Sequence, residues 1–102
     1  MRQYKVVVSD EARKMLKDHV YFLAKVNVDA AKELRGRIMD GIRGLAKMPE
    51  RFPYLDEDNR RSCYRKMMIP NWYLVIYLVA DDTVYVEYIL DGRQDHSWLF
   101  PM

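Results

Sequence analysis

The side chains in this sequence with the clearest chemical potential are cations gathered in its C-terminal half. Arg60, Arg61, Arg65 and Lys66 lie within seven consecutive positions, and Arg93 stands farther along the chain. Cations of this kind position a phosphate backbone and stabilise charge that develops on phosphorus. The simpler alternative is a solvated rim beside the acidic run that precedes them. These residues could converge on one edge of a sheet, and they are therefore candidates for contact with a nucleic-acid or protein target.

Groups able to transfer a proton or to attack a substrate are sparse. The imidazole of His96 titrates near neutral pH and could act as a general acid or base, although the sequence shows no partner for it. Tyr77 could stack on a base or contact a target, but aromatic residues are also favoured inside strands. Cys63 has no neighbouring base, so a structural role is expected.

Composition restricts the class of protein. The 102 residues have room for one domain, 1–102, and half of them are hydrophobic while 31% are charged, which is typical of a globular protein. A net charge of +2 gives no strong overall attraction to nucleic acid or membrane. The single cysteine and the widely separated His19 and His96 leave no metal-ligand spacing, so we expect no metal and no cofactor. Without a long apolar run, a cytoplasmic protein is expected.

The N-terminal half predicts a strand followed by a helical hairpin. Tyr4–Val8 is a β-branched run, and helical spacing of apolar residues then extends over Ser9–Val26 and Asp29–Met48. Ser9 or Asp10 can cap the first helix and Asp29 the second. Three glycines at 36, 41 and 44 lie inside the second helix, where they are unfavourable unless another backbone approaches closely.

The C-terminal half predicts three strands after an irregular connector that runs from 49 to 62. Alternating apolar residues indicate strands at Cys63–Ile69, Trp72–Val79 and Thr83–Leu90, joined by short turns into an antiparallel meander. Both faces of the middle strand are apolar, so cover is expected on both sides: the hairpin on one and a binding surface on the other. The predicted fold is α+β, in the order β-α-α-β-β-β, with the hairpin packed on an antiparallel four-stranded sheet that includes the first strand.

Several strings in the sequence resemble the RelE/ParE toxins of type II toxin–antitoxin systems. The resemblance in the C-terminal half rests on Tyr64-Arg65-Lys66-Met67, on Trp72–Val79 and Val84–Leu90, and on Gly92-Arg93-Gln94-Asp95. In the N-terminal half it rests on Ser9 with Ala12, on Ala30-Ala31, and on Leu45 with Pro49. The resemblance implies the same β-α-α-β-β-β fold and an antitoxin partner whose C-terminal segment wraps the toxin. We expect Tyr21, Phe22 and Trp72 to contribute to the antitoxin surface.

The resemblance leaves two activities open, since the RelE branch cleaves messenger RNA on the ribosome whereas the ParE branch poisons DNA gyrase. RelE-like nucleases look similar but carry further cations on the sheet and a tyrosine or histidine near the C-terminus. Met67, Leu74 and Phe100 stand near those positions here. We therefore predict a ParE-like, non-catalytic inhibitor of growth that acts on gyrase. Its expected target contacts are Arg61, Arg65, Lys66, Tyr77 and Arg93.

Two alternatives accompany this prediction. In a ribosome-dependent endoribonuclease acting on messenger RNA, the catalytic candidates would be Arg65, Lys66, Arg93 and His96. In a non-toxic protein-interaction module of the same fold, the exposed aromatic face would bind a helix or strand of another protein.

Overall fold

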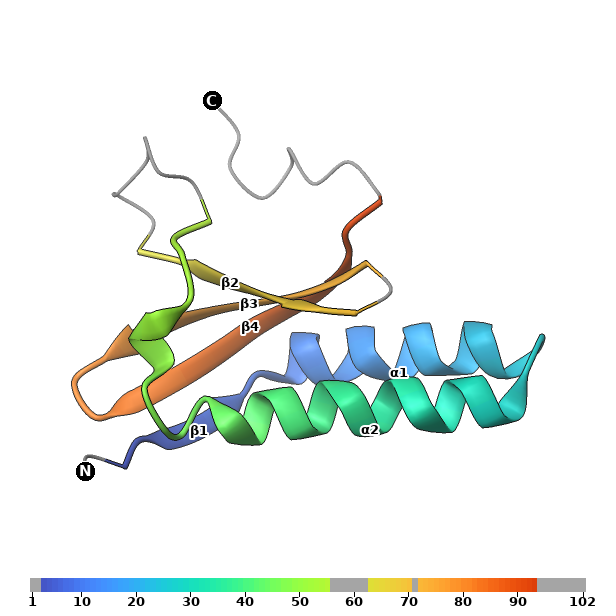
Figure 1. The fold of residues 1–102 in the computed structure, drawn as a ribbon, viewed down its shortest axis with the longest axis horizontal. Coiled ribbons are helices and arrows are strands. Elements are labelled where there is room, and N and C mark those ends of the chain that lie inside the picture. The colour runs from blue at the N-terminus through green and yellow to red at the C-terminus, as the bar shows by residue number, and fades with distance from the viewer. Residues whose placement is uncertain (1–2, 56–62, 71, 94–102) are drawn as a thin grey trace.

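The computed structural model describes residues 3–55, 63–70 and 72–93, and it confirms the α+β architecture. Two helices form a hairpin that covers one face of a four-stranded sheet (Figure 1). The elements are β1 (Lys5–Val8), α1 (Asp10–Ala24), α2 (Val28–Gly44), a short 3-10 helix η1 (Pro49–Arg51), β2 (Arg65–Ile69), β3 (Tyr73–Ala80) and β4 (Thr83–Asp91).

The sheet has the strand order β1-β4-β3-β2 and mixed strand directions. β2, β3 and β4 form the predicted antiparallel meander, with Arg65 opposite Tyr77 and a register shift in β3 between Ile76 and Tyr77. β1 runs parallel to β4, with Lys5 opposite Thr83, so the prediction of a wholly antiparallel sheet is wrong for this pair. The cause is the hairpin: α1 continues away from β1 and α2 returns, so β2 starts at the end where β1 started (Figure 1).

Both helix starts are fixed by side-chain caps. The Ser9 hydroxyl accepts a hydrogen bond from the Ala12 amide at 3.0 Å and donates one to the Glu87 carbonyl at 3.0 Å, so it joins α1 to β4. Asn27 rather than Asp29 caps α2, because its side chain accepts from the Ala30 amide at 3.0 Å. The prediction of Asp29 as cap is therefore wrong by two positions.

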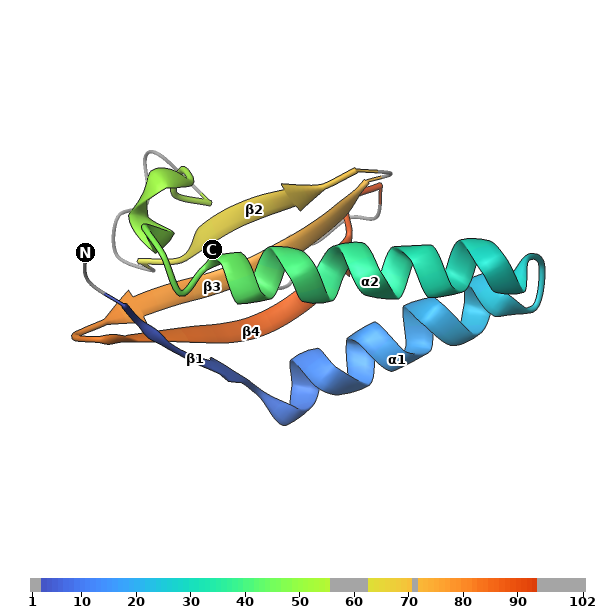
Figure 2. The same cartoon turned by 60° about the horizontal axis from the view of Figure 1, so that its bottom comes forward.

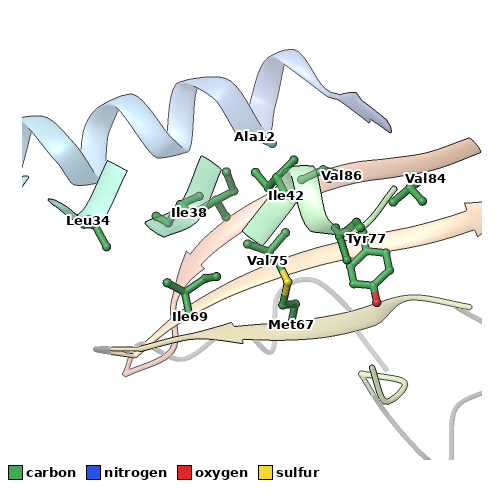
Figure 3. Packing of buried hydrophobic residues seen from close by; sticks show 12 residues of the cluster. Ala12, Leu34, Ile38, Ile42, Met67, Ile69, Val75, Tyr77, Val84 and Val86 are labelled. Carbon is green, nitrogen blue, oxygen red and sulfur yellow. The ribbon is translucent and has the colours of Figure 1, made fainter. Parts of the chain in front are cut away.

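The hydrophobic core lies between the hairpin and the sheet (Figure 3). α2 contributes the row Leu34, Ile38 and Ile42, whose spacing of four residues keeps them on one helix face. The sheet contributes alternate residues of β2 and β3 and residues of β4 on both sides of the register shift, which are Met67, Ile69, Val75, Tyr77, Val84, Val86 and Ile89. Ile76, on the opposite face of β3, is also fully buried, so both faces of this strand are removed from solvent there, although the sequence predicted a binding surface on this second face.

The glycines of α2 differ in what surrounds them. A Cβ atom at Gly41 would lie 2.9 Å from Ile69 Cδ1 and 3.1 Å from Met67 Cε, so the close approach expected from the sequence is made here, by side chains of β2. A Cβ atom at Gly36 would meet nothing within 4 Å. Gly36 thus has the conformational cost of a helical glycine without a packing reason for it.

Gly36→Ala is therefore expected to stabilise the protein by about 0.5–1 kcal/mol, because alanine loses less backbone freedom on folding and its methyl group has space. Thermal unfolding followed by circular dichroism should show a midpoint a few degrees higher. Gly41→Ala is the matched control, and it should gain less because its methyl group presses on Ile69 and Met67. An equal gain in both variants would contradict this packing.

Candidate functional site

The helical hairpin extends beyond one end of the sheet (Figure 2). An open groove is lined by residues of this part of the hairpin and by residues next to the ends of β3 and β4. One arm of the groove, about 370 Å³, is bounded by Leu23 and the first half of α2 on one side and by Trp72, Tyr73 and Arg93 on the other. The second arm shares Leu23, Tyr73 and Arg93 and reaches along α1 to His19, Phe22 and Val26. We call the two arms together the overhang groove.

Exposed apolar side chains surround this groove. Phe22 is 71% exposed, Val26 86% and Trp72 58%, values that are unusual for large apolar residues clustered at one end of a small domain. Tyr21 is 62% exposed beside them, and the ammonium group of Lys25 lies 4.8 Å from its ring centroid and 5.3 Å from that of Phe22. The residues expected to meet an antitoxin thus lie in or next to the overhang groove.

Trp72 and Arg93 form a fixed platform at the rim of the groove. The guanidinium carbon of Arg93 lies 4.8 Å from the Trp72 ring centroid. Asp91 holds that guanidinium through hydrogen bonds from Nε at 3.1 Å and from Nη2 at 2.9 Å. The Gly92 amide donates to the Trp72 carbonyl at 2.5 Å, which ties the chain before β3 to the chain after β4. We call this unit the Trp72–Arg93 platform.

The contacts within the platform shift the pKa values of its side chains and of the neighbouring Tyr73. Hydrogen bonds from Arg93 hold the pKa of Asp91 below its ordinary value, and the same carboxylate raises the pKa of Arg93. Burial raises the pKa of the neighbouring Tyr73, with a smaller contribution from the charge of Asp91. The charged form of the Asp91–Arg93 pair is therefore favoured in the folded protein.

Asp91→Asn is expected to reduce stability at pH 7 and to flatten its dependence on acid. A carboxyl group whose pKa is lowered by folding stabilises the folded state above its ordinary pKa of 3.8, and this contribution is lost as the pH falls through the lowered value. Urea unfolding at several pH values down to about 3 should show the two proteins converging at the acid end. A stability difference between the two proteins that did not change with pH would contradict the lowered pKa of Asp91.

Arg65, another arginine expected to contact a target, makes contacts within the protein. Its Nη1 donates to the carbonyl oxygens of Phe52 at 2.7 Å and Glu50 at 3.1 Å, and its guanidinium carbon lies 4.1 Å from the Tyr54 ring centroid. Arg65 therefore holds the segment after η1 against β2. The backbone of the next residue, Lys66, continues this attachment, because its amide donates to the Pro53 carbonyl at 3.0 Å.

Arg65 and Arg93 do not converge on one site. Arg65 stands opposite Tyr77 in the sheet, whereas the platform adjoins Tyr73, which stands opposite Asp91. Four residues of extended strand separate the two positions by about 13 Å. The sequence-based expectation that these cations gather at one sheet edge is therefore wrong for this pair. Arg61 and His96 lie outside the described residues.

Tyr77 was expected to contact a target, and the structure corrects this prediction. Its side chain is fully buried, and its hydroxyl donates to the Pro49 carbonyl at 2.5 Å (Figure 3). Burial raises the pKa of Tyr77 to about 12. The alternating pattern of β3 left both faces apolar, so the sequence did not distinguish a surface tyrosine from a core one.

His19 is a residue whose role the sequence analysis did not identify. Its Nε2 lies 2.8 Å from the Ile89 carbonyl, and its ring meets Tyr73 edge-on at 5.1 Å. β1 ends opposite Val86, and beyond that point no strand of the described residues pairs with this edge of β4. The Ser9 hydroxyl donates to the Glu87 carbonyl there, and His19 contacts the Ile89 carbonyl. The signal was present as a histidine at helical spacing within the apolar face of the first helix.

Among the described residues, no cluster of three or more histidine, cysteine or acidic side chains is arranged to hold a metal ion. None of the helices in this part of the chain combines the length and the apolar character needed to cross a membrane.

Comparison with known proteins places the chain beside one family. A family model described as the ParE toxin of the type II toxin–antitoxin system parDE matches residues 6–96. A solved structure titled as the chromosomal ParDE toxin–antitoxin system from P. aeruginosa has a TM-score of 0.69 and 14% identity, over 85% of this chain and 94% of that chain. At this identity the likeness concerns the fold alone. No curated protein matches the sequence.

Proposed function

The chain belongs to the ParE toxin family of type II toxin–antitoxin systems, and from this premise we propose that it inhibits bacterial growth by binding DNA gyrase in the cytoplasm. We also propose that a cognate antitoxin neutralises it by occupying the overhang groove. The proposed mode of action is binding without catalysis.

The observation that carries this proposal is the placement of Arg65 and Arg93. An RNA-cleaving site needs several cations and a proton-transferring group around one phosphate. Here Arg65 donates hydrogen bonds to two carbonyls of the connector, and Arg93 is bonded to Asp91. Arg65 is opposite Tyr77 of β3 and Asp91 is opposite Tyr73, so the two arginines adjoin different ends of that stretch of strand. This separation supports a binding function over the ribosome-dependent cleavage of messenger RNA.

The overhang groove supports an antitoxin partner. Leu23 and Ala30 are partly buried at its apolar roof, and Phe22 and Trp72 stand exposed at its edges. A segment that orders on this surface would bury apolar area that the toxin alone leaves in water. Aromatic and arginine side chains of this kind dominate the energetics of many protein interfaces.

Induced expression of the chain in a bacterial host tests the proposal. The expected result is growth arrest with relaxed plasmid DNA and intact ribosome-bound messenger RNA, and restored growth when the antitoxin is expressed with it. Growth arrest with cleaved messenger RNA and normal plasmid supercoiling would overturn the gyrase proposal in favour of the nuclease. Unaffected growth would favour a non-toxic interaction module.

A further inference from the structure

We infer that the Trp72–Arg93 platform determines which antitoxin the overhang groove accepts. The accepted segment places a carboxylate against Arg93 and an apolar side chain in the adjoining hollow between Leu23, Leu34 and Trp72. This inference rests on the proposed function, because it names the chemistry of the partner at the same groove.

The platform is built in advance of binding. Trp72 adopts a φ of 76°, a left-handed conformation that a bulky residue rarely adopts, and yet its indole is 58% exposed. Gly92 permits this arrangement, because a Cβ atom there would lie 2.7 Å from the Trp72 carbonyl oxygen. An unfavourable backbone held in place to present an exposed aromatic ring is a feature of binding sites. A rigid anchor also loses little conformational entropy on association.

The charge that the platform presents is positive. The side chain of Arg93 is 58% exposed, whereas that of Asp91 is only 14% exposed, so a partner meets the guanidinium before the carboxylate. Asp91 engages Nε and Nη2 and leaves Nη1 without a hydrogen-bond partner among the described residues. The remaining N–H groups lie in a fixed plane and are suited to a second carboxylate.

The opposite rim of the groove carries an ion pair. On α2, Glu33 pairs with Arg37 at 2.5 Å, and Glu33 is the more exposed member, at 63% against 42%. The groove thus presents the Arg93 guanidinium after β4 and the Glu33–Arg37 pair on α2, with apolar Leu23 and Ala30 between them. A complementary segment carries an acidic residue on the flank that meets Arg93 and apolar residues in the middle.

A second copy of this chain fits the groove less well. Among the exposed apolar residues that it offers, Tyr21 and Phe22 lie at the hairpin tip, and the ammonium group of Lys25 lies over both rings. Docking this tip into the groove would bring the ammonium group of Lys25 toward the exposed guanidinium of Arg93. Like charges at an interface oppose association, so we assign the groove to the antitoxin.

The test is calorimetric titration of the purified full chain with its purified antitoxin. Arg93→Glu should weaken binding at least about 30-fold, because it brings two carboxylates together. Arg93→Gln, which keeps a polar side chain beside the indole, should weaken binding about tenfold. Arg35→Glu is the matched control, since Arg35 is exposed on α2 outside the overhang groove, and it should change the affinity less than about twofold. Thermal unfolding of each variant establishes that it is folded.

A charge swap makes the test specific. Each acidic residue of the antitoxin's C-terminal segment is changed in turn to lysine. One of these antitoxin variants should bind the Arg93→Glu toxin at least about tenfold more tightly than the unchanged antitoxin does. Equal binding by wild type and by folded Arg93→Glu and Arg93→Gln would overturn this inference alone. No binding by the wild type would overturn the antitoxin partner itself. Self-association of the wild type that Arg93→Glu abolishes would assign the groove to a second copy and likewise overturn the inference.

Discussion

Tyr77→Ala is expected to destabilise the folded state by about 3–5 kcal/mol, enough to unfold much of a small domain at 37 °C. Tyr77, on β3, is the largest of the fully buried side chains in the core, so truncation leaves a large cavity there. It also removes the hydroxyl that bonds to the Pro49 carbonyl and ties η1 to the sheet. Chemical unfolding with urea measures the loss. Tyr85→Ala, at a position on β4 that is 38% exposed, is the control and should cost about 1 kcal/mol.

Tyr77→Phe separates the hydrogen bond from the packing. It should cost about 1–2 kcal/mol, because the buried Pro49 carbonyl loses its partner while the ring remains. The wild type should also lose stability in alkali, since the pKa of Tyr77 rises to about 12 on folding and the folded state resists deprotonation above the ordinary value of 10.0. The phenylalanine variant lacks this titration, so the two proteins should converge as the pH rises. A constant difference through this range would contradict the buried hydroxyl.

Gly92→Ala is expected to have the second largest effect, a loss of about 1–3 kcal/mol together with weaker antitoxin binding. The new methyl group would lie 2.7 Å from the Trp72 carbonyl oxygen, which is backbone and cannot rotate away. The Gly92–Trp72 hydrogen bond must then open, and the indole loses its fixed position under Arg93.

Gly36→Ala is the comparison for Gly92→Ala. The same change from glycine to alanine should raise the stability of the folded state at position 36, in α2, and lower it at position 92, after β4. Urea unfolding and titration with the antitoxin measure both consequences on one preparation. A Gly92→Ala variant as stable as the wild type, with unchanged affinity, would show that the platform does not depend on this close contact.

The sequence predicted the elements better than their contacts. The helical spacing of Leu34, Ile38 and Ile42 and the alternation in β3 follow directly from which face is buried, so helices and strands were placed within a few residues. The parallel pairing of β1 was missed, because the direction of a strand depends on where the hairpin returns the chain and not on local pattern.

The site was harder to predict, because a side chain's role depends on partners that are distant in sequence. Arg65 and Arg93 look alike as exposed cations in the sequence, yet Arg65 bonds to carbonyls of the connector and Arg93 to Asp91. His19 acquires its role from Ile89, seventy positions away. Trp72 was suggested for the antitoxin surface, but its left-handed backbone and its contact with Arg93 appear only in three dimensions.

The most direct measurement is a supercoiling assay in which the purified chain is titrated into DNA gyrase, with ribosome-bound messenger RNA incubated in parallel. Gyrase inhibition that the antitoxin reverses, with uncut messenger RNA, is the expected result. Cleaved messenger RNA with unimpaired supercoiling would contradict the proposal and would make Arg65, Lys66, Arg93 and His96 the catalytic candidates.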